Sequence, residues 1–162
     1  MATTGLLDWA GGRFWLLLGS WFEHKGLGSA AQSCYRNAVA IGGNAADAAF
    51  RLSQQYLADG ENEKTVSLCE EVLARFPRHA RLWCALGAAR RRLARVDEAG
   101  SAYSRAIEID DRYAQAWCNL GEWLMVKGEA EAAFSFWPSA RYCWLKRNAA
   151  SAALPPIATA LR

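Results

Sequence analysis

The sequence repeats one pattern four times at a fixed interval of 34 residues. Four leucines keep strict register, and a glycine or serine follows each of them: Leu18–Gly19, Leu52–Ser53, Leu86–Gly87 and Leu120–Gly121. A period of this length is typical of stacked supersecondary units, because one unit alone cannot bury its apolar face. We therefore expect an elongated solenoid, which offers surfaces for binding rather than an enclosed catalytic pocket.

Each copy contains two apolar stripes at helical spacing. In the third copy, Trp83 and Leu86 belong to the first stripe, and Ala99, Tyr103 and Ala106 form the second. Residues three and four apart lie on one face of a helix, so each half of a copy is predicted to be a helix. A turn residue stands between the halves: Gly26, Gly60 and Gly128, with Ala94 in the third copy. The pattern predicts an αα-hairpin for each copy.

These residues resemble the signature of the tetratricopeptide repeat (TPR), Trp-x2-Leu-Gly-x2-Tyr followed by Ala-x3-Phe and then Pro. Residues 97–111 and 114–128 are the segments most similar to it. The resemblance implies an all-α fold: a right-handed α-solenoid of four TPR helix hairpins with a C-terminal capping or frayed segment. It implies a single domain over 1–162, with repeats at about 12–45, 46–79, 80–113 and 114–147 and a tail at 148–162.

Three positions depart from the pattern. Arg90 occupies a slot that is apolar in the other copies, and we expect its stem to lie along apolar surface with the guanidinium in water. Ala49 replaces the large aromatic residue of the other copies, so packing is expected to be thinner there unless Phe50 compensates. Pro138 lies in the second half of the fourth copy, where it predicts a kinked or split helix.

Charge and apolar segments give no convincing targeting signal, and the cysteines, expected to be reduced, favour a cytoplasmic protein. The net charge is only +3, which gives no strong argument for a nucleic-acid or membrane partner. The most apolar run, residues 14–22, is too short to span a bilayer, which takes about 20 residues. Its register with the other copies predicts that it is the first repeat helix rather than a signal peptide.

Residues for catalysis or metal binding are not grouped in any familiar pattern. The sequence has two histidines and no phosphate-binding or hydrolase motif, so we expect no enzyme activity, cofactor or metal. A disulfide between Cys84 and Cys118 is disfavoured, because these residues project from neighbouring helices. The axes of such helices lie about 8–10 Å apart, whereas a disulfide requires Cα atoms roughly 5.5–6 Å apart. We expect reduced thiols in the core or groove. The five cysteines are Cys34, Cys69, Cys84, Cys118 and Cys143.

In the TPR family the first helix of each hairpin lines an inner groove that binds ligand segments. The resemblance places the following candidates there: Arg13, Leu16, Leu17, Ser20, Asp47, Phe50, Arg51, Gln54, Arg81, Cys84, Ala85, Ala88, Arg92, Gln115, Cys118, Asn119 and Glu122. Arg51, Arg81 and Arg92 are positive points on a neutral and apolar floor. Such a groove suits a peptide or helix with acidic groups and apolar anchors. The alternative is that these residues form ordinary solvated helix faces.

Two specialised TPR binding modes are not supported. The carboxylate clamp for chaperone C-termini uses Lys and Asn on a first helix, whereas Leu16 and Ser20 occupy those slots here, or Phe50 and Gln54 one repeat later. In the asparagine ladder that holds peptide backbones, only Asn119 matches. A heat-shock chaperone partner is therefore not predicted.

The densest basic group is the arginine cluster Arg90, Arg91, Arg92 and Arg95. It could contact RNA or phosphate, but no aromatic stacking platform accompanies it, and a solvated helix end is the favoured interpretation. We therefore predict a non-enzymatic adaptor, scaffold or chaperone-like module that binds another protein. The alternatives are a regulatory accessory subunit of an enzyme or of a secretion or polysaccharide assembly, and RNA binding. Self-association is also plausible through the C-terminal aromatic end, with Trp137, Tyr142, Trp144 and Leu145.

Overall fold

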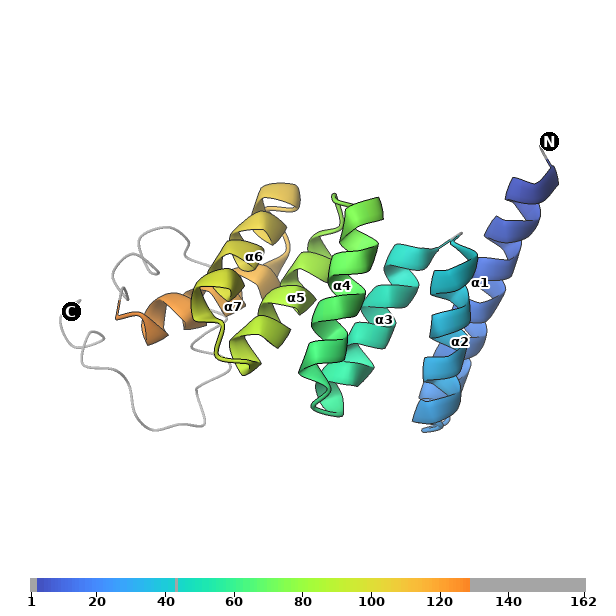
Figure 1. The fold of residues 1–162 in the computed structure, drawn as a ribbon, viewed down its shortest axis with the longest axis horizontal. Coiled ribbons are helices and arrows are strands. Elements are labelled where there is room, and N and C mark those ends of the chain that lie inside the picture. Colours follow the sequence, from blue (N-terminus) through green and yellow to red (C-terminus); the bar gives the residue numbers. More distant parts are fainter. Residues whose placement is uncertain (1–2, 43, 129–162) are drawn as a thin grey trace.

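The computed structural model describes residues 3–42 and 44–128, which contain helices and no strand. The helices are α1 (Thr3–His24), α2 (Gly28–Ile41), α3 (Ala45–Ala58), α4 (Asn62–Arg75), α5 (Ala80–Arg92), α6 (Val96–Ile109) and α7 (Ala114–Val126). They follow one another along the long axis of the molecule in the order of the sequence (Figure 1). The all-α helical-repeat fold predicted from the 34-residue period is confirmed.

The described part consists of three helix hairpins and the first helix of the fourth. Each first helix contacts the next one, in the series α1, α3, α5 and α7. The second helices α2, α4 and α6, all within the described residues, make no such contact with one another. Because one row of helices is closely spaced and the other is spread apart, the solenoid curves towards the first helices. Their exposed side chains form its inner face.

Several predictions concern residues 129–162, which lie outside the described residues. They are the second helix of the fourth hairpin, the kink at Pro138, the tail at 148–162 and the C-terminal aromatic end. The right-handed superhelix also stays a prediction.

The turn inside each hairpin uses a left-handed residue. Gly26, Gly60 and Gly128 have φ angles of 74°, 79° and 79°, and Ala94 has φ 61° in the third copy. In this turn the amide of the residue after the left-handed one donates to a carbonyl of the helix, as Arg95 does to Arg90 at 2.9 Å. The turn predicted from the glycines is confirmed, and the alanine at residue 94 adopts the same strained backbone.

Replacing Ala94 by glycine is expected to stabilise the protein. A residue with a Cβ atom in the left-handed region destabilises the folded state by roughly 1–2 kcal/mol, and glycine removes this strain. The greater entropy of glycine in the unfolded chain offsets part of the stabilisation. We expect Ala94→Gly to raise the free energy of unfolding by about 0.5–1 kcal/mol in urea denaturation. The control is Ala74→Gly in the last turns of α4, which should lower it by up to about 1 kcal/mol. A loss of stability in Ala94→Gly would contradict the interpretation.

Within a hairpin, the small residue after each leucine lies against a large one from the second helix. A Cβ atom built on Gly19 would lie 2.5 Å from Cε1 of Tyr35, and one on Gly87 would lie 2.6 Å from Cε1 of Tyr103. Both tyrosines are fully buried. The two helices therefore approach closely only because the first carries no side chain where the ring lies.

The second hairpin fills the same space with a different pair. Ser53 occupies the glycine slot and Cys69 the tyrosine slot, and both are fully buried. The Ser53 hydroxyl donates to the Phe50 carbonyl at 2.7 Å. Burial raises the pKa of the Cys69 thiol to about 12, so the thiol stays neutral. A larger residue on one helix is thus matched by a smaller residue on the other.

This pairing predicts coupled energies in the third hairpin. Gly87→Ser alone is expected to lower the free energy of unfolding by about 1–3 kcal/mol, because its Cβ overlaps the Tyr103 ring. In a Tyr103→Cys background the same substitution should cost less than about 0.5 kcal/mol, since the ring is gone. A double-mutant cycle in urea measures the difference. Equal costs in the two backgrounds would show that the close approach does not control the packing.

Two further expectations concern the second copy and the cysteines. Ala49 is fully buried in the main apolar cluster, and Phe50 packs against the same cluster, as the compensating alternative predicts.

Among the described residues, Cys34, Cys69, Cys84 and Cys118 are buried free thiols. Cys143 lies beyond that part of the chain.

Candidate functional site

The predicted groove residues lie on α1, α3, α5 and α7, which make up the inner face. Most of them are exposed or half-buried: Arg13, Leu16, Leu17, Ser20, Asp47, Phe50, Arg51, Gln54, Arg81, Ala88, Arg92, Gln115 and Glu122. Because successive first helices contact one another, these side chains form one continuous surface.

Two of the predicted groove residues, Cys84 and Asn119, are buried between α5 and α7 and are not available to a ligand. They are 3% and 7% exposed, and the Asn119 amide donates to the Cys84 sulfur at 3.2 Å. Gln115 in turn donates to the Asn119 carbonyl oxygen at 2.8 Å. The prediction was wrong for Cys84 and Asn119, because these positions pack one first helix against the next. Ala85 and Cys118, also named as groove candidates, are buried too.

Tyr113 joins this contact from the loop before α7. Burial, and then the neighbouring Cys84 thiol, raise the pKa of Tyr113 to about 12, so the phenol stays protonated at neutral pH. Nothing in the repeat pattern predicted this residue, because it lies outside the helical stripes. It packs against the apolar cluster that contains Cys84 and Ala116.

The accessible centre of the inner face combines an aromatic ring with two cations. The guanidinium carbon of Arg81 on α5 lies 5.8 Å from the ring centroid of Phe50 on α3. Arg51, one residue further along α3, is exposed. Neither Arg51 nor Arg81 forms an ion pair with a carboxylate of the described residues. Both positive charges are therefore presented to solvent.

At the edge of this centre, Asp47 contacts a residue that the sequence did not single out for this role. His79 Nε2 lies 3.4 Å from the Asp47 carboxylate, and its other ring nitrogen accepts from the Leu82 amide at 3.3 Å, which caps α5. His79 thus links the start of α5 to α3. Arg81, which lies beside Phe50, follows His79 by two residues.

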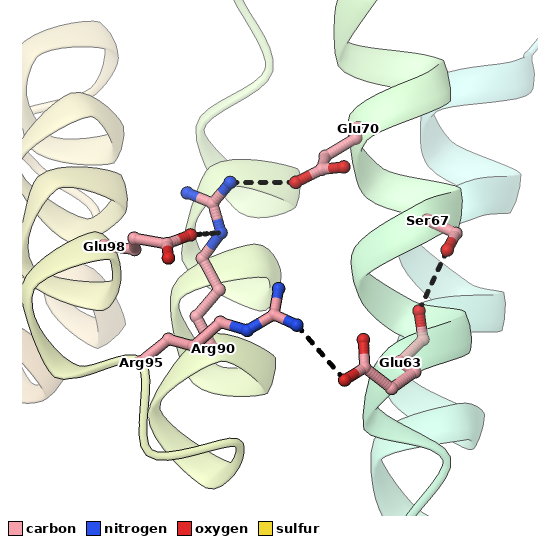
Figure 2. A network of polar contacts seen from close by, with 6 residues as sticks. All are labelled: Glu63, Ser67, Glu70, Arg90, Arg95 and Glu98. Atoms are coloured by element: carbon pink, nitrogen blue, oxygen red, sulfur yellow. Dashed lines mark hydrogen bonds and ion pairs between the residues drawn. The ribbon is translucent and has the colours of Figure 1, made fainter.

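The arginine cluster does not form a free basic surface. Figure 2 shows Arg90 of α5 between Glu70 of α4 and Glu98 of α6, at 2.8 and 3.3 Å. Arg95, in the turn after α5, pairs with Glu63 of α4 at 3.3 Å. The expectation that the Arg90 guanidinium lies in water was wrong, because carboxylates from both neighbouring helices surround it.

The other two arginines of the cluster are also engaged. Arg91 pairs with Glu122 of α7 at 3.6 Å, and Arg92 donates to the Leu57 carbonyl near the end of α3. Arg92 was predicted as a positive point of the groove, but it is bound to that carbonyl. Apart from Glu98, which belongs to the same hairpin, the partners of the cluster lie on neighbouring hairpins, so the cluster links repeats instead of offering four cations to phosphate. The RNA-binding alternative loses its main support.

The described residues contain no group of three or more His, Cys, Asp or Glu side chains placed to hold a metal ion. None of their helices combines the length and apolar character that crossing a bilayer requires.

Residues 80–113, which span α5 and α6, match the family model of the tetratricopeptide repeat. This match agrees with the stacked hairpins and with the glycine–tyrosine contacts inside them. Residues 80–113 are therefore a tetratricopeptide repeat (TPR), and the described helix hairpins have the TPR fold. No curated protein sequence is significantly similar to it.

Solved structures of TPR proteins share this fold at low sequence identity. The thermophilic TPR protein TTC0263 of Thermus thermophilus is 21% identical, with a TM-score of 0.64 over 84% of this chain and 82% of that one. MamA from Desulfovibrio magneticus RS-1, from residue 41 to its end, is 16% identical, with a TM-score of 0.66 over 88% and 78%. The first TPR of Spaghetti (RPAP3), bound to the HSP90 peptide SRMEEVD, is 18% identical, with a TM-score of 0.67 over 74% and 94%.

The ion pairs of Arg90 are expected to stabilise the TPR stack. Arg90→Met removes two partly buried pairs and should lower the free energy of unfolding by about 1 kcal/mol. The effect should shrink in 1 M NaCl, where the Debye length is about 3 Å. Urea denaturation at low and high salt measures it. Arg105→Met is the matched control, because the pair of Arg105 with Glu108 is exposed, and it should change stability by less than about 0.5 kcal/mol.

Proposed function

We propose that this TPR protein is a non-enzymatic adaptor or scaffold that binds a segment of another protein on its inner face. The observation that carries the proposal is the accessible centre of that face. There Arg51 and Arg81 have no carboxylate partner in the described residues, and Arg81 lies over the half-buried ring of Phe50. Cations left without partners beside apolar surface favour an acidic ligand with an apolar anchor.

The two arginines favour an extended peptide or a helix. They come from neighbouring first helices, α3 and α5, so a ligand that contacts both must lie across the inner face. An aspartate or glutamate side chain can accept two parallel hydrogen bonds from one guanidinium group. The apolar surface at Phe50 and Ala88 provides contacts for a residue between two such acids. The partner segment is therefore proposed to carry acidic side chains around an apolar one.

The peptide-bound TPR of Spaghetti supports a peptide ligand for this fold in general, but the chaperone clamp is not reproduced here. The clamp slots hold Leu16 and Ser20 on α1, Phe50 and Gln54 on α3, and Cys84 and Ala88 on α5. None of these side chains is a cation that could bind a terminal carboxylate. We therefore propose internal acidic segments rather than chaperone C-termini as ligands. The buried free thiols fit a reducing compartment, and we propose that the protein acts in the cytoplasm.

The test is capture of partners by the wild-type chain and by the double variant Arg51→Glu/Arg81→Glu, with identification by mass spectrometry. A partner of the inner face should be captured by the wild-type chain, and its affinity for the double variant should fall at least about tenfold, because both attractive charges become repulsive. The control is Arg78→Glu/Arg112→Glu, which makes the same change in net charge in the loops between hairpins. This control should retain the partner.

Two outcomes would contradict the proposal. If the double variant retains every partner of the wild-type chain, recognition does not use the inner face. If the control loses the partners equally, the effect is one of overall charge. Circular dichroism of each variant shows whether the helical fold is intact.

A further inference from the structure

The end of the solenoid at α1 carries an exposed apolar stripe. Phe14, Leu17 and Trp21 are 59%, 66% and 53% exposed, although each is large and apolar. Their spacing of three and four residues places them along one face of the helix. We call these three residues the end stripe. Exposed apolar groups of this size, gathered on one helix face, mark an interaction surface.

The repeat register shows what kind of element covers these positions. One copy later, the equivalent of Phe14 is the buried Ala48, whereas the equivalent of Leu17 is the exposed Arg51. Two copies later, all three equivalents are covered: Leu82, Ala85 and Ala89 are 0%, 3% and 0% exposed. They share an apolar cluster with residues of α3 and α4, the hairpin that precedes α5. Within the described residues, no hairpin precedes α1. The end stripe therefore has the geometry of a contact between helices but lacks its partner.

We propose that a second copy of this chain covers the end stripe, with the two α1 helices antiparallel about a two-fold axis through Leu17. Phe14 precedes Leu17 by three residues and Trp21 follows it by four. A two-fold axis at Leu17 therefore places Phe14 of one copy beside the tryptophan of the other. The stripe is self-complementary, as a two-fold contact between identical chains requires.

The sequence spacing and the charges on α1 support this arrangement. In the sequence, Leu7 and Ala10 continue the same alternation of three and four towards the start of α1, which is the spacing of helices that pair along a seam. Arg13 lies four residues before Leu17. In a parallel pair it would face the arginine of the other copy, whereas in the antiparallel pair it faces Trp21, and like charges stay apart. An aromatic ring is a favourable neighbour for a guanidinium group.

The position of α1 in the fold leaves room for a second copy. It is the first helix of the described residues (Figure 1), and its 22 residues give it a length of about 33 Å. Pairing through the end stripe would join two solenoids at their α1 helices. The accessible centre of each inner face, on α3 and α5, is not covered by this contact. The inference therefore stands independently of the proposed function.

The first experiment measures the mass of the full chain by sedimentation velocity over a range of concentrations. We expect the wild-type chain to have twice the mass of one copy at micromolar concentrations. Leu17→Glu places two carboxylates at the axis and should raise the dissociation constant at least about tenfold. Leu27→Glu is the matched control, because this leucine is 50% exposed in the turn after α1 and lies off the stripe; it should stay a dimer.

The second experiment tests the two-fold axis itself. Leu17→Glu and Leu17→Lys should each be monomeric alone, and an equimolar mixture should form a dimer, because residue 17 of one copy meets residue 17 of the other. A monomeric wild-type chain overturns the proposal, as does a Leu17→Glu dimer, which would move the contact to another surface. Open-ended assembly of the wild-type chain or failure of the mixture to pair also overturns it, since a two-fold contact closes as a dimer.

Discussion

The close approach of the two helices in each hairpin is the constraint on which the rest of the structure depends. Where glycine follows the leucine, the ring of Tyr35 or Tyr103 lies directly on the backbone of the first helix. This contact sets the separation of the two helices, and hence the position at which the next hairpin can pack. In the second hairpin, Ser53 and Cys69 preserve it with a larger and a smaller residue exchanged. The inner face exists because the same separation recurs from hairpin to hairpin.

Polar contacts between hairpins add a second level of organisation. Arg90 and Arg95 pair with Glu70 and Glu63 of α4, and Lys127 lies 2.5 Å from Asp97 of the preceding hairpin. In a solenoid each repeat contacts only its neighbours, so such pairs act at the interfaces that hold the stack together. They also explain why the arginine cluster offers little free positive charge, because Arg90, Arg91 and Arg95 are neutralised by carboxylates.

The periodic part of the fold could be predicted from the sequence, and the contacts between repeats could not. The helices, the turns and the packing within a hairpin depend on residues a few positions apart. The repeated pattern around the four leucines therefore predicts them: Leu18, Leu52, Leu86 and Leu120. The partner of Arg90 in α4 is 20 residues away and the partner of Asn119 is 35 residues away. Which of two neighbouring positions points into the groove, and which into the next helix, depends on the tilt between hairpins. Cys84 and Asn119 were misplaced for this reason, whereas Phe50 is half-buried and Arg51 and Arg81 are exposed.

The first helices differ in the residues that they carry at the positions of the end stripe. In α5 the positions equivalent to the end stripe are small or buried, and the helix is covered by the preceding hairpin. In α1 the same positions hold Phe14, Leu17 and Trp21, so this helix is built for a contact that the described chain does not make with itself. If a second copy makes that contact, the resulting dimer carries two inner faces. A partner with two acidic segments would then bind the second face at a high effective concentration, because the first has already been bound. Pairing at α1 would thus strengthen binding at α3 and α5 without changing a residue of the inner face.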